Sequence, residues 1–218
     1  MAEKTKKPKT TKKADKKEVT AKQPTKIVAV IDRSGSMESV KDDAIGGFNT
    51  FLEEQKKLPD KATFTLIEFN HGTQVKYSDV DISEVKPYTI DTYRPEGMTA
   101  LYDAVGKGIG EATRKGDAHK VIVVILTDGH ENSSHEVTKE AVSKMIEQHT
   151  AEGWAFIFLG VGFSQFDAET IAKSMSINAD MAMGTSRADI GTKAFSSMSN
   201  ATASYRSSNS VNSNWRKR

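Results

Sequence analysis

The chain contains no cysteine, which excludes disulfide bonds and thiolate metal ligands. It also has no apolar run near the ~20 residues that a membrane-spanning helix needs, and its first residues lack the apolar segment of a secretory signal peptide. We therefore expect a cytoplasmic protein with no membrane contact. The length of 218 residues and the hydrophobic content of 37% suffice for one domain with a buried core.

The chain also lacks an even distribution of positive charge along its length. Residues 1–26 hold ten lysines and three acidic residues, a net charge of +7, which leaves −5 for the rest within the total of +2. We expect residues 1–25 to be a disordered Lys-rich tail, because this low-complexity stretch has little to bury. The tail is either a spacer or a weak electrostatic contact for nucleic acid, and no aromatic residue there offers stacking on bases. Residues 206–218 are rich in Ser and Asn and predict a second, flexible tail.

Between the tails, apolar strands alternate with helical patterns. The runs 27–31, 121–126 and 155–159 are fully apolar or nearly so, which is typical of strands buried on both faces. The runs 63–69 and 73–77 flank an Asn-His-Gly turn and predict a hairpin with an antiparallel strand at the sheet edge. This order predicts an α/β domain over residues 26–205, with a doubly wound, mostly parallel sheet and helices on both faces.

The expected helices follow apolar residues at helical spacing. They begin after residue 36, at residue 101, near residue 133, near residue 165 and near residue 188. For the third helix, Ser133 and Glu136 have the spacing of a capping box, which predicts that the helix starts there.

Carboxylates and hydroxyls stand where two of the buried strands end. Asp32, Ser34 and Ser36 follow the first strand, Asp128 follows the strand 121–126, and Thr99 opens a helix. If the two strands are neighbours, these side chains converge at the edge of the sheet where ligands bind in open α/β folds. Two carboxylates about 5 Å apart repel by about 3 kcal/mol at an effective dielectric near 20, and a bound cation removes that cost. Hard oxygen donors favour Mg²⁺ or Mn²⁺.

The pattern Asp32-x-Ser34-x-Ser36, then Thr99, then Asp128 in a Thr-Asp-Gly turn resembles the metal-ion-dependent adhesion site of von Willebrand factor A domains. Residues 44–49 and 99–104 look most similar to stand-alone bacterial or phage members. The resemblance implies that the three hydroxyls bind the metal directly, while Asp32 and Asp128 act mostly through water. It also implies that the cation accepts an Asp or Glu from a partner protein. An AAA+ ATPase is a candidate partner by family analogy only.

Other functions are weighed against this one. The motif could serve only to hold three loops together, or the protein could act on nucleic acid through its lysine tail. We expect no enzymatic activity, because an aspartyl phosphotransferase would normally need a second acid where Ser34 stands. Five loop residues are the expected contact rim for a partner: Arg33, Met37, Met98, His130 and Glu131. Arg33 is expected to point outward.

Overall fold

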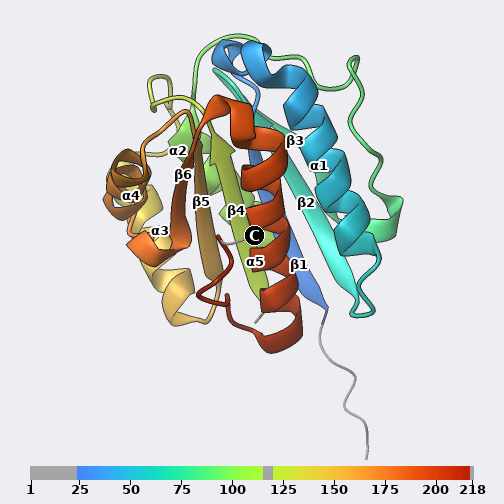
Figure 1. Ribbon diagram of the computed structural model, residues 1–218. Coiled ribbons are helices and arrows are strands. Elements are labelled where there is room, and N and C mark those ends of the chain that lie inside the picture. Colours follow the sequence, from blue (N-terminus) through green and yellow to red (C-terminus); the bar gives the residue numbers. More distant parts are fainter. Residues whose placement is uncertain (1–23, 115–119, 217–218) are drawn as a thin grey trace, which may run out of the picture.

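One sheet of six strands forms the centre of the protein, as the computed structural model shows for residues 24–114 and 120–216 (Figure 1). The strand order is β3-β2-β1-β4-β5-β6. The strands are β1 (Thr25–Asp32), β2 (Ala62–Phe69), β3 (Thr73–Asp81), β4 (Val121–Thr127), β5 (Ala155–Val161) and β6 (Ala182–Thr185). The α-helices are α1 (Lys41–Lys56), α2 (Leu101–Thr113), α3 (Lys139–Ala151), α4 (Gln165–Ser174) and α5 (Phe195–Ser208).

The pairing of the strands confirms the predicted fold class. β1 is parallel to both β2 and β4, β5 is parallel to β4 and β6, and β3 alone pairs antiparallel, with β2. Because β1 and β4 are direct neighbours, the loops that follow them leave the sheet side by side. This adjacency is the condition that the predicted site needed.

Helices cover both faces of the sheet (Figure 1). In β1, Ile27 and Ile31 belong to the apolar cluster that packs with α1 and α5, while Val28 and Val30 belong to the cluster that packs with α2, α3 and α4. All four side chains are buried, so the apolar run has no solvent-facing side. Alternation of side chains across the strand explains why a continuous apolar sequence feeds two separate cores.

One local prediction is wrong, and one strand was not predicted. α3 begins at Lys139, not near Ser133, and its N-cap is Thr138, whose hydroxyl accepts a hydrogen bond from the backbone N–H of Ala141 at 3.2 Å. The supposed capping box fails because the backbone N–H of Glu136 donates to the Asp103 carboxylate instead. The sequence pattern also gave no sign of β6, a strand of only four residues.

The segment 206–216, which we expected to be flexible, packs against the domain. α5 continues to Ser208, and Arg206 is 1% exposed and donates a hydrogen bond from Nη1 to the Gln55 carbonyl at 2.6 Å. Trp215 is 2% exposed, and its indole N–H donates to the Asp180 carbonyl at 3.0 Å. The expected lysine tail lies outside the described residues, except that Thr25 already belongs to β1.

None of the helices in the described part of the chain is long and apolar enough to span a membrane.

Candidate metal centre

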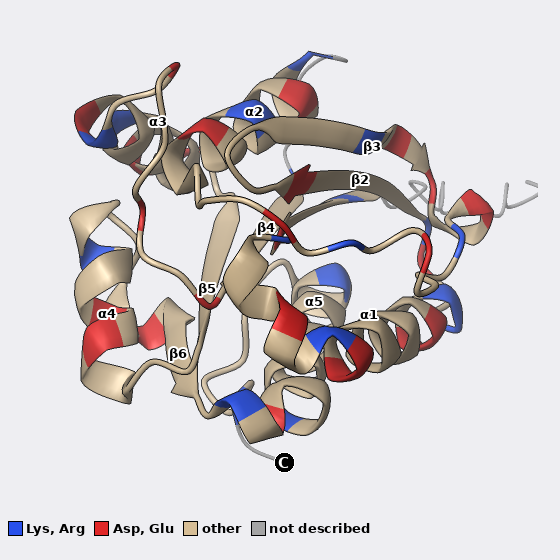
Figure 2. Ribbon diagram, turned by 90° about the horizontal axis from the view of Figure 1, so that it is seen from above, with Lys and Arg blue, Asp and Glu red and all other residues tan. Residues whose placement is uncertain are grey.

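The predicted site residues lie at the edge of the sheet where the parallel strands end, which Figure 2 shows from above. Asp32 is the last residue of β1, and Asp128 directly follows β4. The two strands are in parallel register, with Ile31 opposite Leu126. Topology thus brings together two carboxylates that are far apart in the sequence.

A chain of hydrogen bonds connects the loop after β1 to the loop after β4. The Ser34 and Ser36 hydroxyl oxygens are 3.1 Å apart, and the Ser36 hydroxyl donates to Asp128 Oδ1 at 2.6 Å. Asp32 Oδ1 accepts from the backbone N–H of Ser34 at 2.7 Å, which fixes the turn that carries both serines. Four of the five predicted residues are therefore joined directly.

Asp32 is fully buried at the base of this cluster. Its Oδ2 accepts from the Thr127 hydroxyl at 2.5 Å, and its backbone carbonyl accepts from the Tyr93 hydroxyl at 2.5 Å. Burial raises the pKa of Asp32 from 3.8 to about 6. The hydrogen bonds from Thr127 and Ser34 to the carboxylate lower this pKa in part, and the nearby charge of Asp128 raises it further. Burial also raises the pKa of Tyr93 well above its usual value, so this hydroxyl stays a donor. A bound cation would favour ionised Asp32.

Thr99, the fifth predicted residue, is held at the same place by the loop after β4. Its backbone N–H donates to Asn132 Oδ1 at 2.8 Å, and its carbonyl accepts from the backbone N–H of Asn132 at 3.0 Å. A Cβ at Gly129 would lie 2.8 Å from Thr99 Oγ1, so the hydroxyl lies directly against the turn that carries Asp128. Thr99 is 3% exposed.

Two acidic side chains hold the loop after β4 against the start of α2. The Glu131 carboxylate accepts from the backbone N–H groups of Tyr102, Ser133 and Ser134 at 2.8–3.1 Å. Asp103 does the same for the backbone N–H groups of the three following residues, 135–137, at 2.7–2.9 Å. Glu131 therefore shapes the loop, and its prediction as a residue of the contact rim is not supported by its position.

The rim prediction fails for two more residues. Met37 is fully buried in the core beneath the loop. The Arg33 side chain does not point freely outward, because it is only 18% exposed and its Nη1 donates to Glu96 Oε1 at 3.2 Å. The backbone around Arg33 is also tied to the loop before α2: Glu96 N–H donates to the Arg33 carbonyl at 2.8 Å, and Gly35 N–H to the Gly97 carbonyl at 3.0 Å.

Met98 and His130 do lie on the surface beside the cluster. Met98 is 52% exposed, and the exposed His130 ring stands edge-on to Phe163 with 4.9 Å between ring centroids. Phe163 lies in the loop after β5, which no sequence pattern had connected with the site.

Arg187 was also missed by the sequence analysis. It lies after β6, and its Nη1 is 2.5 Å from Asp128 Oδ2. The same nitrogen donates to the Ser36 carbonyl at 3.0 Å and to the Ser39 hydroxyl at 3.1 Å. A single arginine in a segment without a motif gives no signal in the sequence, and only the position of β6 brings it here.

The residues fit a hard divalent cation. Within residues 24–114 and 120–216, no three His, Cys, Asp or Glu side chains gather to hold a metal, so a metal at this edge would need hydroxyl ligands. Three hydroxyls and two carboxylates provide that set, which suits Mg²⁺ or Mn²⁺. Asp128 Oδ2 is buried and lacks the neutral hydrogen-bond donor that buried oxygens usually have, and its charged neighbour is the Arg187 guanidinium at 2.5 Å.

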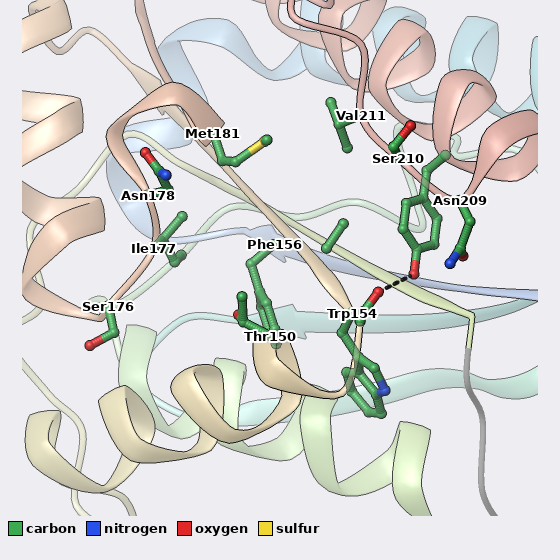
Figure 3. A pocket seen from close by; sticks show the side chains of 13 residues that line it. Thr150, Trp154, Phe156, Ser176, Ile177, Asn178, Met181, Asn209, Ser210 and Val211 are labelled. Atoms are coloured by element: carbon green, nitrogen blue, oxygen red, sulfur yellow. Dashed lines mark hydrogen bonds between the residues drawn. The ribbon is translucent and has the colours of Figure 1, made fainter.

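A pocket of about 370 Å³ lies at the opposite edge of the sheet (Figure 3). Its lining comes from the start of β5, from the last turns of α3 and α5, and from the segments that follow α3, α4 and α5. Trp154, Phe156 and Ile177 provide apolar walls, and the Tyr205 hydroxyl donates to the Gly153 carbonyl at 2.8 Å. None of the five predicted metal ligands lines this pocket.

The chain belongs to the von Willebrand factor type A domain family, whose model matches residues 26–197. A comparison with curated proteins finds no match. The family match confirms the resemblance that the site residues indicated.

Comparison with solved structures agrees on the fold. The von Willebrand factor domain of the type V pili tip protein Mfa5 from Porphyromonas gingivalis has a TM-score of 0.62 and 11% identity, covering 83% of this chain and 95% of that one. The pilus adhesin SpaC from Lactobacillus rhamnosus GG has a TM-score of 0.59 and 15% identity, with coverages of 81% and 30%.

A third structure is proximal thread matrix protein 1 from the mussel byssus with a zinc-occupied metal-ion-dependent adhesion motif. Its TM-score is 0.53 and its identity 17%, with coverages of 78% and 46%. This chain spans 30–45% of the length of the first three solved structures it resembles. At such low identities these likenesses establish the fold and nothing finer.

Proposed function

We propose that the protein binds a divalent cation at the carboxyl edge of its sheet and uses it to hold an acidic side chain of a partner protein. The direct ligands in this proposal are Ser34, Ser36 and Thr99, with Asp32 and Asp128 acting mostly through water. The observation that carries the proposal is the hydrogen-bonded cluster of Ser34, Ser36 and Asp128 over buried Asp32. Mg²⁺ or Mn²⁺ is the proposed ion, and Zn²⁺ is worth comparing because a distant structural relative holds zinc.

The chemistry of the ligands explains why a partner's carboxylate would bind. Neutral hydroxyls do not cancel the charge of the cation, so a bound Mg²⁺ would keep much of its positive charge and attract an anionic oxygen. On the protein side, the hydrogen bonds that fix Ser34 and Thr99 hold these hydroxyls in place before any cation arrives. Exposed Met98 and the His130–Phe163 pair beside the cluster offer apolar contact for the residues around the partner's acidic group.

The functional class, the location and the kind of partner belong to the same proposal. We propose a binding protein, not an enzyme, located in the cytoplasm of a bacterium or encoded by a phage. An AAA+ ATPase is one partner of suitable kind, supported by family analogy only. The pilus proteins among the structural relatives offer a different comparison, since both share the fold and one of them is named a pilus adhesin.

Titration calorimetry tests the metal part of the proposal. Protein stripped with EDTA is titrated with Mg²⁺, Mn²⁺, Ca²⁺ and Zn²⁺, and the wild type should bind Mg²⁺ or Mn²⁺ with one site while Asp128→Ala does not. Asp91→Ala is the matched control, because this carboxylate is exposed and pairs only with nearby Arg94 in the described contacts. Failure of the wild type to bind any of the four ions would contradict the proposal.

The partner is then sought on immobilised protein with Mg²⁺ or with EDTA. A captured protein supports the proposal only if it is retained by the wild type with Mg²⁺ and lost both with EDTA and with Asp128→Ala. Retention that instead falls steeply with salt, and disappears on removal of residues 1–23, would favour nucleic acid or another polyanion bound by the lysine tail.

A further inference from the structure

Arg187 contacts the same carboxylate that the metal site uses. Its Nη1 is 2.5 Å from Asp128 Oδ2, while Asp128 Oδ1 accepts from Ser36. The Asp128 side chain is fully buried, whereas that of Arg187 is 41% exposed. The guanidinium therefore reaches from the surface down to a buried anion.

The path of the Arg187 side chain is set by its surroundings. Gly162, after β5, has φ +78°, and its backbone N–H donates to the Thr185 carbonyl at 2.6 Å. A Cβ at Gly162 would lie 3.3 Å from Arg187 Nε, so the arginine passes close over this backbone. At its end, the guanidinium also donates to the Ser36 carbonyl and the Ser39 hydroxyl. The four contacts connect the segment after β6 to the loops after β1, β4 and β5.

The guanidinium and a divalent cation have conflicting requirements at this place. Both are attracted by Asp128, and two positive charges within a few ångströms repel each other. The same guanidinium nitrogen bonds the backbone of Ser36, whose hydroxyl is a proposed metal ligand. The positions that suit one cation therefore disfavour the other.

We propose that Arg187 is an internal competitor for the metal site: its guanidinium must leave Asp128 before a divalent cation binds tightly. This inference rests on the proposed function and adds a residue that sets the affinity of the site. The segment that carries Arg187 continues through a π-helical turn, Ile190–Ala194, into α5. Binding of the cation would thus favour a different position of residues 186–189.

The test compares Mg²⁺ and Mn²⁺ affinity of EDTA-stripped wild type and Arg187→Gln by titration calorimetry. Removal of the competitor should tighten binding about tenfold, which lies within the usual range of coupling between two binding events on one protein. Arg33→Ala is the matched control, because Arg33 also lies beside the site but pairs with Glu96 and Glu68 and not with Asp128. It should change the affinity little, which separates direct competition from a general loss of positive charge.

A second variant and a second readout complete the design. Ser39→Ala removes one acceptor of Arg187, together with the hydrogen bond that the Ser39 hydroxyl donates to the Ser36 carbonyl at 3.2 Å, and leaves every proposed ligand side chain in place. It should tighten binding in the same direction by a smaller factor. In EDTA, Arg187→Gln should unfold at a lower temperature than the wild type, because Asp128 loses its ion pair. In saturating Mg²⁺ this difference should shrink or reverse.

The outcomes are distinguishable. Tighter binding by Arg187→Gln than by the wild type supports the competition. Equal or weaker binding by Arg187→Gln, with the wild type binding normally, overturns it and leaves the proposed function intact. Absence of metal binding in both proteins overturns the proposed function and this inference with it.

Discussion

The edge where the parallel strands end and the edge where they begin differ in the groups that they bury. At the carboxyl edge, the neighbouring loops after β1 and β4 bury Asp32 and Asp128. Burial raises the pKa of Asp32 to about 6. At the opposite edge, the pocket is lined mainly by apolar and aromatic groups, and Tyr205 donates to a backbone carbonyl. The first edge keeps two buried carboxylates, which are held by hydrogen bonds and by Arg187 and which a bound cation would also stabilise, while the second contributes packing. We infer that binding belongs to the carboxyl edge and stability to the other.

The largest expected effect comes from removing hydroxyls at the carboxyl edge. In Ser34→Ala/Ser36→Ala both carboxylates stay but two proposed direct ligands are lost, so Mg²⁺ should no longer stabilise the protein. For the wild type, Mg²⁺ at 100 times its Kd should add about 2.7 kcal/mol to the free energy of unfolding. Thermal unfolding with and without Mg²⁺ measures this gain. Ser210→Ala, at the opposite edge, should keep it, and full retention of the gain in the double variant would argue against hydroxyl ligation.

A substitution at the opposite edge should lower stability without changing metal affinity. Trp215→Ala removes a side chain that is 2% exposed in the core cluster, and we expect a loss of about 3 kcal/mol in the free energy of unfolding, measured in urea. The affinity of the folded variant for Mg²⁺ should equal that of the wild type. A parallel loss of metal affinity would show that the two edges are coupled, contrary to the comparison.

A smaller effect is expected from the support of Thr99. Asn132→Ala removes the side-chain oxygen that accepts from the Thr99 backbone N–H, and loss of such outer support typically weakens metal affinity 10–100-fold. Calorimetry measures the change. Asn178→Ala, which removes a comparable Asn cap of the Asp180 N–H at the other edge, is the control and should leave the affinity unchanged.

The smallest predicted effect is that of pH on the buried carboxylate. Since the pKa of Asp32 is raised from 3.8 to about 6 in the folded protein, its contribution to stability without metal is full below pH 3.8 and is lost as the pH rises through about 6. Mg²⁺ needs the ionised form, so lowering the pH from about 7.5 to about 5.5 should weaken binding about fourfold from this group alone.

The variant Asp32→Asn identifies the source of this pH dependence. In EDTA it should lack the fall in unfolding free energy between about pH 4 and 6 that the wild type shows, as chemical denaturation at several pH values would reveal. An unchanged pH profile in Asp32→Asn would assign the titration to another group.

Much of the carboxyl edge could be predicted because its signals are local. The apolar run before Asp32 and the run before Asp128 mark buried parallel strands, and a sheet of that kind places the residues after them at one edge. The spacing of Ser34 and Ser36 then follows from the turn that Asp32 caps. Here one short segment of sequence determines both structure and position.

The features that escaped prediction depend on long-range contacts. Arg187 reaches Asp128 only because β6 pairs with β5, and a four-residue strand with Gly and Thr in it carries no pattern. Trp215 looks like part of a polar tail until its indole ring packs into the core. The Ser133 box has the right spacing, yet the carboxylate of Asp103 takes the N–H groups that a helix start there would need.

The most direct test is a crystal structure of the protein soaked in Mn²⁺, with the metal located by its anomalous scattering. We predict one strong peak at the carboxyl edge, bonded to the hydroxyl oxygens of Ser34, Ser36 and Thr99, with the Arg187 guanidinium moved away from Asp128. A well-ordered site with no peak there, or a peak only elsewhere on the molecule, would contradict the central claim that this cluster is a metal-binding site.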